Sequence, residues 1–179
     1  MSERGTQLLQ TADRQLSELI DLLSTRDEAA LSLPCPGREK LGDGTVAASA
    51  SHTADNYLRI AAFLRGEDHQ PATHGDRGHG PHRIPSFLRA RGHGSSHDQD
   101  RHSAPHRAED VGREGLLERL SAGRDALSVL GDLTDAQLEA VPPASDMKFC
   151  DGQRTLAQVV TNLLNHQSHQ LDALKAALA

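Results

Sequence analysis

Aromatic residues are scarce in this sequence. Its 179 residues include no Trp, one Tyr and three Phe. A core with so few rings has to be built from Leu, Val, Ile and Ala. That composition suits helix-on-helix packing better than a sheet, because sheets draw on aromatic and β-branched residues. We therefore expect an all-α fold, and the length fits a single domain over residues 1–179.

Long apolar runs, basic clusters and cysteines are also lacking. No apolar run approaches the ~20 residues of a membrane span, and the polar start of the chain is unlike a signal peptide. The formal charge is −6, and no cluster of Lys and Arg carries interleaved aromatics, which argues against a nucleic-acid surface. Two cysteines are too few for a disulfide scaffold. We expect a cytoplasmic protein that binds neither nucleic acid nor membrane.

Apolar periodicity predicts four long helices, which together make a four-helix bundle. They cover residues 5–31, 45–65, 109–130 and 155 to the C-terminus. Asp43 or Thr45 can cap the second helix, and Thr155 with Gln158 fits a capping box for the last. A short additional helix is expected over residues 134–140, with Thr134 as its cap.

The histidines are the abundant feature, and most of them fall between the second and third helices. Residues 66–108 lose the apolar periodicity and hold eight of the eleven, namely His69, His74, His79, His82, His93, His97, His102 and His106. This composition cannot bury enough apolar surface to offset the entropy of ordering, so we expect a long, flexible His-rich loop. Three interpretations are open: a metal-collecting tract, a lid closing through Ile84–Leu88, or a solvated insertion without a role.

Two of the other histidines are placed by helical phase toward the bundle interior. His166 shares a face with Val159 and Leu163, and His52 lies in an alanine-rich stretch of the second helix. A buried imidazole needs a hydrogen-bond partner or a metal ion, and bundle cores commonly build metal sites from facing helices. Two ordinary core histidines are the alternative. Asp55 can either orient His52 or serve a surface role.

The cysteines are weaker candidates for this site. Cys35, in a rigid connector between Pro34 and Pro36, can approach the site or be a small buried apolar residue. Cys150 precedes the last helix and is separated from His166 by roughly 20 Å of helix, so we do not expect it to be a ligand.

Two groups of short motifs resemble the DinB-like superfamily, which includes the mycothiol-dependent maleylpyruvate isomerases and related thiol transferases. The first group comprises Leu33-Pro34-Cys35-Pro36-Gly37, Asp43-Gly44-Thr45-Val46 and His52-Thr53-Ala54-Asp55; the second comprises Arg154-Thr155-Leu156-Ala157 and Asn165-His166-Gln167-Ser168-His169-Gln170. The resemblance implies a helical bundle with a three-residue metal site.

The resemblance makes His52 and His166 two of the metal ligands. The family's last ligand usually lies four residues after the first one on the closing helix, and Gln170 stands there in this chain. His169, one residue earlier, is the expected third ligand, with Gln170 as the alternative. Arg38 also replaces the Trp that often follows the Pro-Gly turn in the family.

The function that the resemblance implies is that of a metal-dependent enzyme, a thiol-dependent S-transferase or an isomerase. Zn²⁺ is the expected ion, with Ni²⁺, Co²⁺ or Mn²⁺ as others, and an open position on it would bind a thiolate or water. Partners would be a small-molecule substrate and a low-molecular-weight thiol, and a homodimer is an allowed assembly. No general base can be named.

Two other functions stay open beside the enzyme. The first is a metal-binding or metal-sensing bundle without turnover, to which the His-rich loop adds weak capture. The second is a bundle that binds no metal and acts through its surface. Gln170 at the expected ligand position favours both of these over the enzyme.

Overall fold

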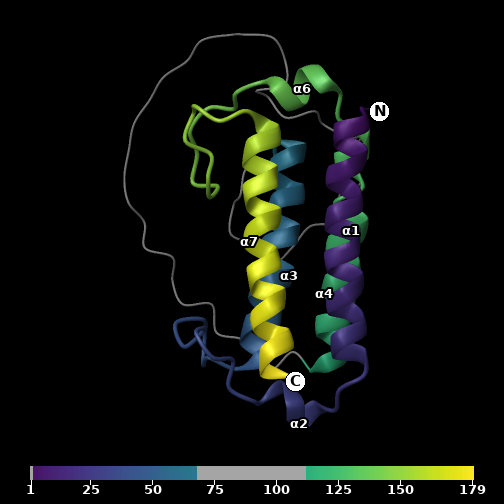
Figure 1. The fold of residues 1–179 in the computed structure, drawn as a ribbon, viewed down its shortest axis with the longest axis vertical. Coiled ribbons are helices and arrows are strands. Elements are labelled where there is room, and N and C mark those ends of the chain that lie inside the picture. Colours follow the sequence, from purple (N-terminus) through teal and green to yellow (C-terminus); the bar gives the residue numbers. More distant parts are fainter. Residues whose placement is uncertain (1, 68–111) are drawn as a thin grey trace.

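The computed structural model describes residues 2–67 and 112–179, and all the elements in these two ranges are helices (Figure 1). They are α1 (Glu3–Ser24), α2 (Glu28–Leu31), α3 (Val46–Arg65), α4 (Arg113–Ala126), α5 (Val129–Asp132), α6 (Asp135–Glu139) and α7 (Leu156–Ala177). The predicted all-α class is confirmed. None of the helices within the described ranges combines the length and apolar composition needed to cross a bilayer.

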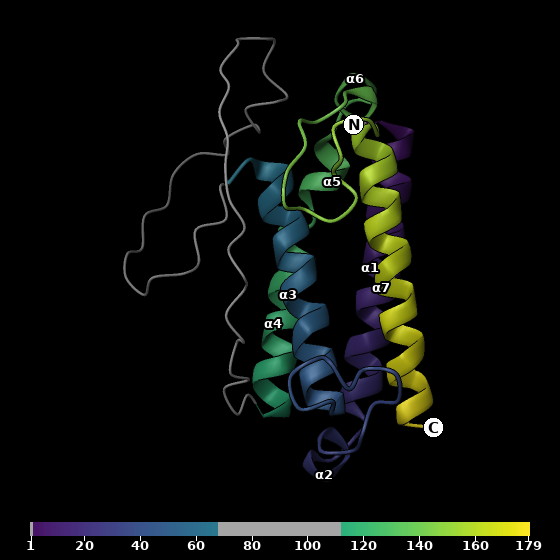
Figure 2. The ribbon, with the colours of Figure 1, turned by 90° about the vertical axis from the view of Figure 1, so that its left-hand side faces the viewer.

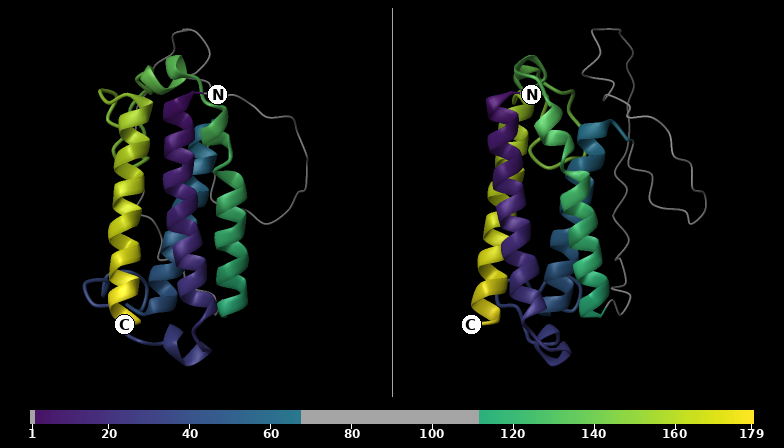
Figure 3. Two further views of the ribbon diagram at one scale, coloured as in Figure 1. Left: turned by 45° about the vertical axis from the view of Figure 1, so that its right-hand side comes forward. Right: turned by 90° about the vertical axis from the view of Figure 1, so that its right-hand side faces the viewer.

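The four long helices lie side by side as a bundle (Figures 1 and 3). Helices α1 and α3 each pack against both α4 and α7. Helices α3 and α4 run in the same direction, because Arg119 reaches Ser51 while Arg65 reaches the carbonyl of Ala126 (Figure 2). The N-terminal end of α4 therefore lies at the same end of the bundle as that of α3.

The chain between α3 and α4 holds the predicted insertion at residues 66–108. Apart from Gly66 and Glu67, this insertion lies outside the described residues, and so do its eight histidines and the segment Ile84–Leu88. The first residues of the predicted third helix, 109–111, lie outside them as well.

Three helices, α3, α6 and α7, start at the caps that the sequence predicted. The hydroxyl of Thr45 accepts from the N–H of Ala48 and caps α3, while Asp43 accepts from Thr45. Thr134 and Thr155 each form a full capping box, which starts α6 and α7. These local side-chain bonds satisfy N–H groups that the first helical turn leaves unpaired.

The prediction of one helix over residues 5–31 is wrong, because α1 ends at Ser24 and a separate helix, α2, begins at Glu28. The hydroxyl of Thr25 donates to the carbonyls of Asp21 and Leu22 at the end of α1. The carboxylate of Asp27 then accepts from the N–H of Ala30 and starts α2. Short polar side chains thus offer the backbone an alternative to continuing the helix.

The prediction that the third helix continues to Leu130 is also wrong, since α4 ends at Ala126 and α5 follows as a separate turn. The turn packs against the start of α1, where the N–H of Ser2 donates to the carbonyl of Leu133. At Gly5 the two segments approach so closely that a Cβ would lie 2.7 Å from the carbonyl oxygen of Leu130.

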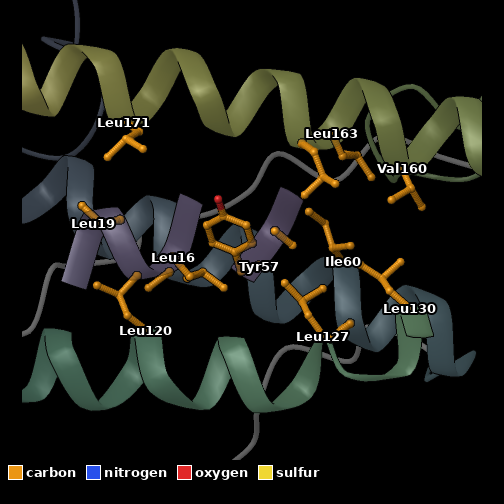
Figure 4. Close-up of a cluster of buried hydrophobic side chains, with 14 of the residues drawn as sticks. Leu16, Leu19, Tyr57, Ile60, Leu120, Leu127, Leu130, Val160, Leu163 and Leu171 are labelled. Carbon is orange, nitrogen blue, oxygen red and sulfur yellow. The ribbon is translucent and has the colours of Figure 1, made fainter. Parts of the chain in front are cut away.

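Leucine dominates the core, as the scarcity of aromatic residues predicted. Figure 4 shows Tyr57 surrounded by aliphatic side chains from α1, α3, α4 and α7. The phenol of Tyr57 donates to Gln15 Oε1 at 2.9 Å, and Gln15 Nε2 donates to the Leu164 carbonyl and Ser168 Oγ, both at 3.1 Å. This buried chain of hydrogen bonds links α1, α3 and α7 at the centre of the bundle.

Candidate functional site

A cavity of about 220 Å³ lies between α3, α7 and the loop that precedes α7. On each of the two helices the residues that line the cavity are three or four positions apart, so one face of α3 meets one face of α7 there. The lining residues are His52, Asn56, Arg59 and Ile60 from α3, Leu163, His166 and Gln167 from α7, and Asp146, Met147 and Lys148 from the loop. The cavity thus contains the predicted pair, His52 and His166, on facing helices.

His52 is half-buried in this cavity and favours the neutral imidazole. Burial is the main cause that lowers its pKa below the ordinary value. The carboxylate of Asp55 raises the pKa, but the nearby charges of Arg59, Arg38 and Lys148 lower it further. A neutral ring keeps a lone pair free, which is the state that a metal ligand requires.

His166 is also partly buried, and burial again leads the causes that lower its pKa, followed by the charge of Lys148. Its Nε2 lies 3.3 Å from Gln170 Nε2 and 3.4 Å from Lys148 Nζ. An ammonium group can only donate, so the Nε2 atom of His166 accepts and carries no proton. The ring of Phe149 meets the imidazole edge-on, with centroids 6.5 Å apart.

His169 lies apart from this pair. It is exposed and does not line the cavity, and its carbonyl accepts from Arg38 Nη2 at 3.1 Å. On an α-helix, residue i+3 is turned about 60° from residue i in one direction, while i+4 is turned about 40° in the other. The solvent-facing side of α7 therefore takes His169, whereas Gln170 points inward and is 2% exposed.

The expected set of three histidines is therefore not assembled. Within residues 2–67 and 112–179, no three His, Cys, Asp or Glu side chains lie close enough together to hold a metal ion. Two amides stand near the histidines instead. The Oε1 atoms of Gln167 and Gln170 are both buried without a hydrogen-bond partner. Buried acceptors without donors are uncommon, and one explanation for them is an absent water or ion.

The remaining sequence candidates serve structural roles. Asp55 pairs with Arg119, which also donates to Ser51, so the carboxylate joins α3 to α4 and the surface interpretation is favoured. Cys35 is fully buried in the core, as its apolar interpretation expected. Cys150 is buried too, and its thiol donates to the Pro143 carbonyl at 3.2 Å. Neither cysteine lines the cavity.

Sequence reasoning missed the polar partners of the two histidines. Asn56 and Arg59 follow His52 by four and seven residues, so helical phase alone predicts that both lie on the same face of α3 as His52. Lys148 had no such signal, because it lies in a loop without periodicity and is placed by the docking of that loop.

Comparison of this chain with known proteins identifies no relative: no protein-family model, curated protein or solved structure matches it.

The lowered pKa of both cavity histidines predicts that the metal-free protein is less stable in acid. A group whose pKa is lower in the folded than in the unfolded state binds more protons when unfolded. The free energy of unfolding should therefore fall as the pH drops from about 7 to about 5, through the ordinary histidine pKa of about 6.5. Urea unfolding at several pH values measures this slope.

A variant pair isolates the contribution of the cavity. The double variant His52→Gln, His166→Gln should show a flatter dependence on pH, whereas His169→Gln, which alters an exposed residue of the same helix, should follow the wild type. Equal slopes in all three proteins would show that the cavity histidines do not cause the loss of stability.

Proposed function

We propose that this chain is a metal-dependent bundle of the DinB-like type, in which His52 and His166 hold one divalent ion, with Zn²⁺ as the favoured metal. The observation that carries the proposal is the convergence of two neutral, partly buried imidazoles from facing helices on one cavity. The activity that we propose, a thiol-dependent S-transferase or an isomerase acting on a small molecule, rests on the resemblance of the motifs around His52 and His166 to that superfamily.

The donor set fits a metal with open coordination positions. Besides the two imidazole nitrogens, the amide of Gln170 is a further candidate donor. Its Nε2 faces His166 Nε2, while its Oε1 is buried without a partner. A half turn of this amide exchanges the two atoms and presents the oxygen beside the imidazole nitrogen. Gln170 is therefore the third donor in this proposal, and Zn²⁺ accepts nitrogen and oxygen ligands.

The cavity walls can bind and orient a small substrate. A bound ion would lower the pKa of a thiol or a water at its open position. Arg59 and Lys148 line the cavity and make no ion pair within the described part of the chain, so neither positive charge is neutralised by a carboxylate and both can attract an anionic group. Ile60, Met147 and Leu163 add an apolar wall to the same space.

A metal-binding bundle without turnover is the second candidate. It is favoured by the amide donor, which is a weaker ligand than the imidazole or carboxylate of a typical catalytic zinc site. The eight histidines of residues 66–108 would then add weak capture around the core site. Full metal occupancy without thiol-dependent turnover, across a panel of electrophiles and maleylpyruvate-like substrates, would favour this candidate over the enzyme.

The metal content of protein purified without a His-tag tests the core site. After equilibration with Zn²⁺ and dialysis, the wild type should hold one more ion per chain than His52→Ala, measured by mass spectrometry of the metal. His169→Ala is the matched control, because it removes an exposed histidine outside the cavity and should keep the wild-type content. The same stoichiometry in all three proteins would place every bound ion outside the core.

A further inference from the structure

Two positive charges in the cavity between α3 and α7 have no carboxylate partner. Arg59 and Lys148 both line this cavity, and neither makes an ion pair within the two described ranges. Asp146 lines it as well, but its side chain is exposed and pairs with neither cation. A hollow lined by unpaired charges of one sign attracts a ligand of the opposite sign. The lining therefore favours an anion.

The amount of charge points to a carboxylate. Two cations and one carboxylate in the lining leave one net positive charge, since both histidines favour the neutral form. A carboxylate carries one negative charge, whereas a phosphate monoester carries nearly two at neutral pH. The guanidinium group of Arg59 can also bind a carboxylate through two parallel hydrogen bonds.

Lys148 is held at the cavity by the side chains beside it. Its Nζ atom lies 3.4 Å from His166 Nε2 and 5.3 Å from the centroid of the Phe149 ring. The Nε2 atom of Gln170 faces the same imidazole nitrogen at 3.3 Å, so that nitrogen has donors on two sides. An ammonium group has three N–H donors, and a contact with one imidazole leaves the others for a ligand.

One buried acceptor in the cavity wall has no donor. Gln167 lines the cavity and is 1% exposed, yet its Oε1 atom makes no hydrogen bond within the described part of the chain. Native structures leave few buried polar atoms unsatisfied, because each one has lost its water without a replacement. A ligand that brings a hydroxyl group into the cavity supplies the missing donor. An ammonium group would also donate, but the positive charges of Arg59 and Lys148 disfavour it.

The remaining wall limits the size and shape of the ligand. Ile60, Met147 and Leu163 give the cavity an apolar side. The volume of about 220 Å³ is below the ~300–1,000 Å³ that is usual for pockets of drug-sized molecules. These features fit a compact molecule with an apolar body and a polar head.

We propose that the cavity binds a small hydroxy acid with an apolar body. The carboxylate of the ligand contacts Arg59 and Lys148, and its hydroxyl group donates to Gln167 Oε1. Its body packs against the apolar side of the cavity. The inference names a ligand class for the cavity of the proposed function, but it does not rest on the metal ion proposed there, because none of these contacts involves a metal.

Titration of the isotope-labelled protein with mandelate, followed by NMR, tests the inference. Protein and buffers are first passed over a chelating resin, so that no metal contributes. Mandelate is a hydroxy acid with a phenyl body, and two analogues each lack one of its features. Mandelamide has no negative charge and should bind about tenfold more weakly, whereas phenylacetate has no hydroxyl group and should bind about fivefold more weakly.

Variants locate the binding in the cavity. Arg59→Met and Lys148→Met should each weaken mandelate binding about tenfold and leave that of mandelamide nearly unchanged. The matched control is Lys40→Met, which removes the same charge from an exposed residue outside the cavity and should bind mandelate like the wild type. Gln167→Met should remove the preference for mandelate over phenylacetate.

Three results would overturn the inference. The first is a wild type that shows no saturable spectral change with mandelate. The second is an equal affinity for mandelate and mandelamide, or Arg59→Met and Lys148→Met variants that bind mandelate as tightly as Lys40→Met. The third is an equal affinity for mandelate and phenylacetate, which would exclude the hydroxyl contact.

The metal content proposed above is a separate measurement, so the two proposals can fail independently. A chain that holds no ion in the core yet binds mandelate would contradict the metal site and support this inference. A chain that holds the ion and does not bind mandelate would do the reverse.

Discussion

Replacing Tyr57 by alanine should lower the free energy of unfolding by about 3–5 kcal/mol, the range typical of a buried aromatic ring cut back to a methyl group. The ring is 1% exposed and packs at the centre of the bundle among side chains of all four long helices (Figure 4). The change also leaves Gln15 Oε1 without its donor in a buried position. Urea unfolding followed by circular dichroism measures the loss.

Tyr57→Phe separates the two causes. It keeps the ring and removes only the hydroxyl group that donates to Gln15, so its loss should be about 1–2 kcal/mol. A Tyr57→Ala variant no less stable than Tyr57→Phe would mean that packing around the ring contributes little. That result would contradict the position of Tyr57 in the core.

The second large effect is expected at Gly5, where alanine should destabilise the protein by about 1–3 kcal/mol. A Cβ at this position would lie 2.7 Å from the carbonyl oxygen of Leu130 and 3.2 Å from that of Leu133. Both are backbone atoms, so α1 and α5 have to move apart to make room. Helix propensity alone predicts the opposite sign, because alanine favours a helix over glycine by about 1 kcal/mol.

Thermal unfolding of Gly5→Ala beside Gln10→Ala tests this close approach. Gln10 is an exposed residue of the same helix, and its replacement should change the melting temperature little. A Gly5→Ala protein that melts at or above the wild-type temperature would show that propensity prevails and that α5 does not lie so near α1.

Helix starts could be predicted from the sequence because their determinants are local. Thr45, Thr134 and Thr155 each bond to an N–H group three residues later, and a pattern of this kind is complete within one turn. The breaks after Ser24 and Ala126 could not be predicted from apolar periodicity. At the second of these the chain turns to pack α5 on α1, which is a contact between distant segments.

The residues of the candidate site also differ in whether local sequence determines their position. Helical phase alone brings His52 and His166 to one cavity, since both lie on regular helices with a clear apolar stripe. Helical phase also distinguishes His169 from Gln170, because only Gln170 is turned toward the bundle interior. The prediction chose His169 because an imidazole is the better metal ligand, although Gln170 has the more favourable position on the helix. Lys148 could not be foreseen, because its contact with His166 joins a loop to a helix across tertiary structure.

The scarcity of aromatic residues gives this protein an unusual optical property. Tyr57 is its only tyrosine, and there is no tryptophan to accept its excitation or to mask its emission. The fluorescence of the native chain, excited at the tyrosine band, therefore originates from one ring at the centre of the bundle, hydrogen-bonded to Gln15. Loosening of the core at that point can be followed without any label.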